Sequence, residues 1–285
     1  MIALEGKSKE EASKQIWYIS RSITQAYFRL VDKLGLCVKG QGEKLTSAQK
    51  PFARDNDEIP SNGDKIDLMA VIKHVKPNIL IGCSTVPGSF TKEIIQEMAS
   101  HVDRPIVFPL SNPTRLHEAQ PKDINDWTKG KALIATGSPF KPVTYNGKEY
   151  DIAECNNCLV YPGIGLGCVL SRADRLTDEM IVAAAHGLAE LSPALKDPDL
   201  ALLPDINNVR ETSVAVAMEV IKQCVKEGLN RVKDIPEKDA ELKAWIKDQM
   251  FVPEYRPFEK VDGADASREA RGELGMKGRS FSIAQ

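Results

Sequence analysis

Apolar positions along the chain alternate between helical spacing and short continuous runs. Apolar residues three or four positions apart predict helices at 66–75 and 91–100. Continuous apolar runs at 79–82, 105–110 and 132–136 are typical of strands that are buried on both faces. Because helices separate these strands, the pattern predicts βαβ units and therefore a parallel sheet.

Two further apolar runs predict a strand at 28–31 and a last strand at 157–161. Beyond them the spacing becomes helical, and we expect helices at 164–172, 178–191 and 209–228. The pattern therefore favours one α/β domain that is followed by a helical part.

Composition adds few constraints. The 285 residues carry a formal net charge of −2 and are 42% hydrophobic, which are ordinary values for a globular protein. Basic residues form no long run, so neither nucleic acid nor a membrane is an expected partner. No apolar stretch approaches the roughly 20 residues that a membrane helix needs. Six widely spaced cysteines favour a reducing compartment, such as the cytoplasm or the mitochondrial matrix.

Small polar residues follow each predicted strand, where an open parallel sheet binds its ligand. The positions just past the strands are Asp32, Cys83, Ser84, Thr85, Ser111, Asn112, Gly137, Ser138, Asn156 and Asn157. The same residue types are also common in ordinary turns between strands and helices. On pattern alone, a ligand crevice and plain turn chemistry explain these residues equally well.

Two motifs with suggestive spacing do not predict sites. The glycines at 163, 165 and 167 lack the spacing of a dinucleotide phosphate loop, and we expect them to let a helix pack closely. Cys155 and Cys158 have metal-site spacing, but no second pair of ligands lies near them in the sequence.

An ordered series of turns carries a resemblance to a known family. Leu-Ser-Asn-Pro-Thr at 110–114 is followed by Gly-Ser-Pro-Phe at 137–140. Asn-Asn at 156–157 and Pro-Gly at 162–163 come next, and Val-Asp at 31–32 precedes them all. In this order the motifs resemble the malic enzyme family, and the resemblance spans about residues 6 to 255.

The resemblance implies an oxidoreductase reaction, the oxidative decarboxylation of malate to pyruvate and carbon dioxide. NAD, or alternatively NADP, would take a hydride from C2 of malate. A bound Mg²⁺ or Mn²⁺ would then stabilise the enolate as a Lewis acid. The intact enzyme is expected to be a homo-oligomer.

The resemblance also implies roles for particular residues. Asn112, Asn156 and Asn157 correspond to residues that bind malate. The residues expected to contact the cofactor are Cys83, Ser84, Thr85, Asn112 and, at the adenosine ribose, Asp32. Family members that prefer NADP often carry Lys near the position of Gln49, so NAD is the favoured cofactor.

Several parts of the family pattern are not found in this sequence. They are an upstream tyrosine acid, a lysine base, a substrate-binding arginine, the acidic metal ligands and the glycine-rich turn. We therefore assign no catalytic residue and no metal ligand. The expected fold is a Rossmann-like, doubly wound parallel sheet that is truncated at its first strand. It would span residues 1–230, with a partly disordered, helical carboxyl-terminal extension at 231–285.

These departures leave several hypotheses open. As an isolated chain, the protein is expected to be an inactive malic enzyme fragment. The alternatives are a non-catalytic module for nucleotide binding or subunit interaction, or another dehydrogenase on the same sheet. Residues 18–29 interrupt the family pattern between Gln-Ile-Trp and Leu-Val-Asp, and we interpret them as an insertion from unspliced or misassigned sequence.

Overall fold

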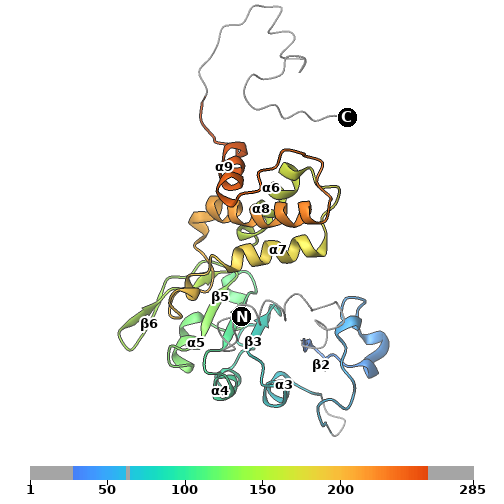
Figure 1. Ribbon diagram of the computed structural model, residues 1–285. Helices are drawn as coiled ribbons and strands as arrows, with labels where there is room; N and C mark the ends of the chain where they lie inside the picture. The colour runs from blue at the N-terminus through green and yellow to red at the C-terminus, as the bar shows by residue number, and fades with distance from the viewer. Residues whose placement is uncertain (1–27, 62–64, 256–285) are drawn as a thin grey trace, which may run out of the picture.

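In the part of the chain that the structure describes, a four-stranded parallel sheet forms the centre of the fold. The computed structural model describes residues 28–61 and 65–255 (Figure 1). The strands of this sheet are β3 (Ile79–Gly82), β4 (Ile106–Pro109), β5 (Leu133–Thr136) and β8 (Ala153–Glu154), in the order β3-β4-β5-β8. All neighbouring pairs are parallel. This confirms the predicted Rossmann-like α/β class.

Three helices cover one face of this sheet. They are α3 (Leu68–Val75), α4 (Lys92–His101) and α5 (Pro121–Trp127). Asp67 and Thr91 begin α3 and α4 because their side chains accept hydrogen bonds from the backbone N–H groups of the first helical turn. The predicted helices at 66–75 and 91–100 are therefore correct to within two residues.

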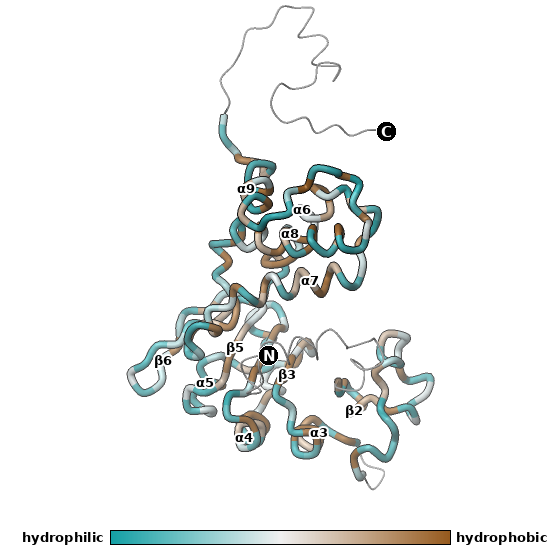
Figure 2. Tube along the Cα trace, viewed as in Figure 1, coloured by the Kyte–Doolittle hydropathy of each residue, from teal (hydrophilic) through white to brown (hydrophobic). Residues whose placement is uncertain are grey.

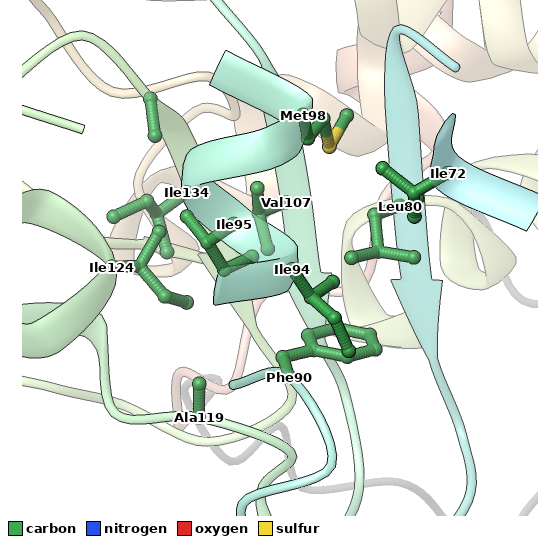
Figure 3. Close-up of a cluster of buried hydrophobic side chains, with 11 residues drawn as sticks. Ile72, Leu80, Phe90, Ile94, Ile95, Met98, Val107, Ala119, Ile124 and Ile134 are labelled. Atoms are coloured by element: carbon green, nitrogen blue, oxygen red, sulfur yellow. The ribbon is translucent and has the colours of Figure 1, made fainter. Parts of the chain in front are cut away.

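The main core lies between these helices and the strands. Figure 3 shows side chains of α4 against Leu80 and Val107 of the sheet. Ile95, Met98 and Val107 are fully buried. On the opposite face, Ile81 of β3 is 49% exposed, so the described residues leave that part of the sheet uncovered.

The first strand differs from the prediction. The run at 28–31 yields only β1 (Val31–Asp32), which pairs antiparallel with β2 (Gly35–Leu36) in a separate two-stranded sheet. Leu36 packs with Ile59, Ile66 and Val71 in a small core of its own. Asp32 therefore does not end a strand of the main parallel sheet.

The predicted last strand at 157–161 is wrong. Asn157–Leu159 forms a 3-10 helix, and α6 (Tyr161–Ser171) begins directly after it. The side chain of Asn156 accepts a hydrogen bond from Cys158 N, and Pro162 fits the first turn of α6. Both features start a helix, so the last strand of the sheet is the earlier β8.

The structure contains a hairpin that the hydrophobic pattern did not predict. It consists of β6 (Val143–Tyr145) and β7 (Lys148–Tyr150), which pair antiparallel. Asn146 and Gly147 have φ angles of 50° and 76°, as the tight turn requires. Asn-Gly is a strong hairpin signal, and it stands in the sequence at this position.

The remaining helices pack on one another. They are α6, α7 (Asp178–Ala189), α8 (Val209–Lys226) and α9 (Asp239–Gln249). Figure 1 shows them above the sheet, with α3–α5 below it, and Figure 2 shows hydrophobic residues on α7 and α8. The described short 3-10 helices are Lys39–Lys44, Lys50–Phe52, Thr114–Leu116, Asn157–Leu159, Pro193–Leu195 and Ile206–Asn208. None of the described helices is long and apolar enough to span a membrane.

The expected helical extension packs against the part before it. Leu242 and Ile246 of α9 are buried with Val214 and Ile221 of α8. Residues 18–27 of the proposed insertion and the residues of the extension beyond 255 lie outside the described residues.

Candidate functional site

The loops that follow the four parallel strands lie along one edge of the sheet. These loops are 83–85 after β3, 111–114 after β4, 137–139 after β5 and 155–157 after β8. Because the strands are parallel neighbours, their carboxyl ends share this edge. The sheet thus brings together all the candidate site residues except Asp32.

Asn112 is held in place by the neighbouring loop. Ser138 Oγ donates a hydrogen bond to Asn112 Oδ1 at 2.5 Å. A Cβ atom at Gly137 would lie 2.5 Å from the carbonyl oxygen of Leu110 and 2.9 Å from Asn112 Nδ2, so only glycine leaves room here. Asn112 itself is exposed.

The two asparagines after β8 differ in their surroundings. Asn156 is half-buried, its Oδ1 accepts from Cys158 N at 3.0 Å, and its Nδ2 donates to Glu154 Oε1 at 2.9 Å. Asn157 is exposed. Of the candidate substrate amides, Asn112 and Asn157 are therefore open to solvent, whereas Asn156 is bonded locally.

The loop after β3 is tied to the loop after β4. Thr85 has a φ angle of 57°, which is unusual for a residue with a side chain. Its backbone N–H donates to Ser111 Oγ at 2.9 Å, and Val86 N donates to Ser84 Oγ at 3.1 Å. These bonds hold the strained loop in place.

A buried carboxylate joins both loops, and the sequence pattern did not reveal it. Glu118 is 0% exposed, and its Oε1 accepts from Ser84 N at 2.8 Å, Ser84 Oγ at 2.7 Å and Ser111 Oγ at 2.5 Å. Burial acts to raise the pKa of Glu118, but the hydrogen bonds from Ser111 and Ser84 outweigh it and hold the pKa below its usual value. Glu118 is therefore ionised at neutral pH.

The cysteines at this edge are poor nucleophiles. Burial, with a smaller contribution from Glu118, raises the pKa of the Cys83 thiol. Burial and then Cys83 raise the pKa of Cys155. Both thiols thus stay protonated at neutral pH, and all six cysteines are free. Within residues 28–61 and 65–255, no three His, Cys, Asp or Glu residues cluster to hold a metal ion.

Asp32 is not in one of these loops but on the β1–β2 hairpin. Its Oδ1 accepts from Lys33 N at 2.7 Å, and its Oδ2 accepts from Gln49 Nε2 at 2.6 Å. The structure therefore places Asp32 and Gln49, the two residues that the sequence linked to the adenosine side of a cofactor, in direct contact.

The sequence of this chain is similar to those of known proteins. The family model described as "Malic enzyme, NAD binding domain" matches residues 1–225. The NAD-dependent malic enzyme of Schizosaccharomyces pombe is 50% identical over 232 residues, which are 80% of this chain and 40% of that protein. NAD-dependent malic enzyme 3 of Bacillus subtilis is 42% identical over 262 residues, which are 90% of this chain and 43% of that protein.

Solved structures agree with the sequence relatives. The crystal structure of Entamoeba histolytica malic enzyme is similar with a TM-score of 0.57 and 25% identity, over 80% of this chain and 43% of that one. The chain spans less than half of the length of these relatives. Because the family model matches most of its residues, the chain belongs to the malic enzyme family.

Proposed function

We propose that this chain is the NAD-binding portion of a malic enzyme, whose complete form oxidises and decarboxylates malate to pyruvate and carbon dioxide. The observation that carries the proposal is the row of loops at the carboxyl edge of the sheet, because the loops with residues 83–85, Asn112 and Asn157 follow neighbouring parallel strands. The names of the relatives support both NAD and malate as ligands.

The proposed roles follow from the chemistry of these side chains. Asn112, Asn156 and Asn157 would bind malate, because neutral amides orient carboxylate and hydroxyl groups without adding charge. Asn156 would have to exchange its bond to Glu154 for one to the substrate. Bound NAD would supply the acceptor for the hydride that leaves C2 of malate.

The proposed cofactor residues are Cys83, Ser84, Thr85 and Asn112, with Asp32 at the adenosine ribose. The position of the first four residues at the strand ends suits a nicotinamide nucleotide, whereas Asp32 would approach it from the separate β1–β2 hairpin. Gln49, which donates to Asp32, has no positive charge to pair with a 2′-phosphate. We infer that NAD is preferred to NADP.

No metal site is proposed within the described residues, because their acidic, His and Cys side chains form no suitable cluster. We also assign no general acid or base. The isolated chain is therefore expected to show no turnover. A bound metal ion and a general acid and base supply much of the rate acceleration, and neither is assigned here.

A second candidate function is a module for subunit interaction. It is favoured by the apolar residues that α6 leaves exposed, Tyr161 at 63% and Val169 at 58%. Scattered apolar residues are normal on surfaces, but a helix that is apolar on all sides is usually covered.

Calorimetry of the purified chain tests the proposal. We expect NAD to bind, NADP to bind more weakly, and Gln49→Lys to shift the preference toward NADP. A chain that binds neither nucleotide but co-purifies with an intact homologous subunit would support the second candidate. A malate-, NAD- and Mn²⁺-dependent rise in absorbance would refute the predicted inactivity.

A further inference from the structure

Glu118 forms the centre of a hydrogen-bond network between two loops. Its Oε1 accepts bonds from Ser84 in the loop after β3 and from Ser111 in the loop after β4. Its Oε2 lies 3.5 Å from the backbone nitrogen of Ser111. Ser111 immediately precedes Asn112, so the network connects the proposed cofactor loop with the proposed malate-binding amide.

The charge of Glu118 is stabilised by neutral donors. The N–H and O–H groups of Ser84 and Ser111 donate to it, and its own backbone N–H contributes as well. A buried carboxylate of this kind is costly unless every donor stays in position. The two loops therefore depend on each other: displacing either one leaves the buried charge with fewer donors.

Close packing keeps the carboxylate where it is. A Cβ atom at Gly82, the last residue of β3, would lie 2.5 Å from Glu118 Cδ. The backbone of Glu118 is also fixed, because its carbonyl oxygen accepts from Phe90 N at 3.1 Å. Glycine at position 82 therefore leaves the space that the Glu118 carboxylate fills, and the backbone bond from Phe90 holds its base.

The network extends to Thr85. Ser111 Oγ donates to Glu118 and at the same time accepts from Thr85 N. Thr85 adopts the left-handed conformation, which persists only when its surroundings enforce it. The same carboxylate thus orients Ser84 directly and Thr85 through Ser111.

We propose that Glu118 is a positioning residue that couples the cofactor loop, residues 83–85, to Asn112, so that both adopt one fixed arrangement. The functional meaning of this coupling rests on the proposed NAD- and malate-binding roles. The coupling itself is a property of the ligand-free chain and is measurable without a ligand.

Hydrogen exchange of the full 285-residue chain tests the coupling. Glu118→Gln replaces one carboxylate oxygen by an amide NH₂ group and removes the charge. We expect exchange at residues 83–86 and 110–112 to accelerate about tenfold or more, because bonds to a charged group are the strong ones. Exchange in α8 should stay unchanged. Glu149→Gln on the exposed strand β7 is the matched control and should change neither loop.

The outcomes of this experiment are distinct. Unchanged exchange in both loops would overturn the proposal, and so would an equal acceleration in α8, which indicates a purely structural role. If Glu118→Gln does not fold, Ser84→Ala replaces it. That variant should accelerate exchange at residues 110–112 in the other loop, and no effect there would also overturn the coupling.

Nucleotide binding tests the functional meaning separately. We expect Glu118→Gln to weaken NADH binding, followed by nicotinamide fluorescence, by about tenfold. Binding of ADP-ribose, which lacks the nicotinamide, should stay unchanged. An equal loss for both nucleotides would argue against positioning at the nicotinamide side. If the wild-type chain binds neither, the proposed function fails, while the exchange experiment still decides the coupling.

Discussion

At the scale of single residues, His117 shows how burial without a partner creates a pH dependence. It is 2% exposed, and neither ring nitrogen has a hydrogen-bond partner among the described residues. Its ring lies 5.3 Å from that of Phe140. Burial lowers the pKa of His117 below its usual 6.5, although Glu118 acts in the opposite direction.

We predict that His117→Phe stabilises the protein. The substitution removes two unpaired buried nitrogens, each of which costs about 1–3 kcal/mol. Below pH 6.5 the unfolded chain binds a proton at His117 that the folded chain does not, so wild-type stability falls as the pH decreases. The advantage of the variant should therefore be larger at pH 5.5 than at pH 8, as measured by urea denaturation. The exposed His74→Phe is the control, and an equal pH effect there would contradict the assignment to His117.

Glu118 and Asn112 show how far residue types alone can predict a site. Asn112 was found because it follows a strand inside a specific motif. Glu118 lies in the connection between β4 and α5, where sequence does not distinguish a buried acid from a surface one. The available signal was a pair of serines, Ser84 and Ser111, at neighbouring strand ends.

At the scale of elements, the glycines of α6 differ in their surroundings, because some lie against α8 and one faces open space. A Cβ atom at Gly163 would lie 2.5 Å from Val216 Cβ and 2.9 Å from the carbonyl oxygen of Ser213, both on α8. At Gly165 it would meet nothing within 4 Å. We expected these glycines to permit close packing, and the structure shows such a contact with α8 for Gly163 and Gly167 but not for Gly165.

We predict opposite effects for two alanine substitutions in this helix. Gly163→Ala should destabilise the fold by about 1–3 kcal/mol, because α6 and α8 must move apart. Gly165→Ala should be neutral or stabilise by up to about 1 kcal/mol, because alanine favours the helix. Thermal unfolding measures both changes. Equal losses for the two variants would contradict the role of Gly163 in the close approach of α6 to α8.

The elements that could be predicted are those in which the hydrophobic pattern and the flanking turn or cap residues indicate the same structure. β3 matches its predicted range because its apolar run lies between turn residues. Residues 157–161 are also apolar in part, but the cap at Asn156 and Pro162 makes them helical. Local capping, rather than hydrophobicity, decided that segment.

At the scale of the whole molecule, Asp199 connects parts that are distant in sequence. It accepts a hydrogen bond from Arg104 at 2.7 Å and forms an ion pair with Lys148 of β7. Lys148 and then Arg104 lower the pKa of Asp199 through hydrogen bonds. The loop between α7 and α8 is thereby attached to the hairpin and to the connection between α4 and β4.

We predict that Asp199→Asn lowers the free energy of unfolding by about 0.5–1 kcal/mol, since the pair is partly exposed. A lowered folded-state pKa contributes stability above the usual value of 3.8, and this contribution is lost as the pH falls through the folded-state pKa. Denaturation at pH 7 and at pH 3 should therefore show a larger difference from wild type at pH 7. Asp57→Asn, at an exposed site, is the control. An equal effect at both pH values would exclude the ion pairs as its cause.

The division of the chain into residues 1–230 and 231–285 remains a proposal. The packing of α9 on α8 shows that the extension shares a core with the preceding helices. We therefore expect limited proteolysis to leave the connection between α8 and α9 intact. Early cleavage near residue 230 would instead indicate a separable extension.

The sequence by itself determined the family, the parallel α/β class and the identity of the amides at the strand ends. It could do so because these depend on local period and on residues that are close along the chain. Only the tertiary structure decided that Glu118 joins Ser84 and Ser111, and that Asp32 lies on a separate hairpin in contact with Gln49. The physical reason is that strand pairing and burial depend on residues far apart in sequence, and a local pattern does not encode which of them meet.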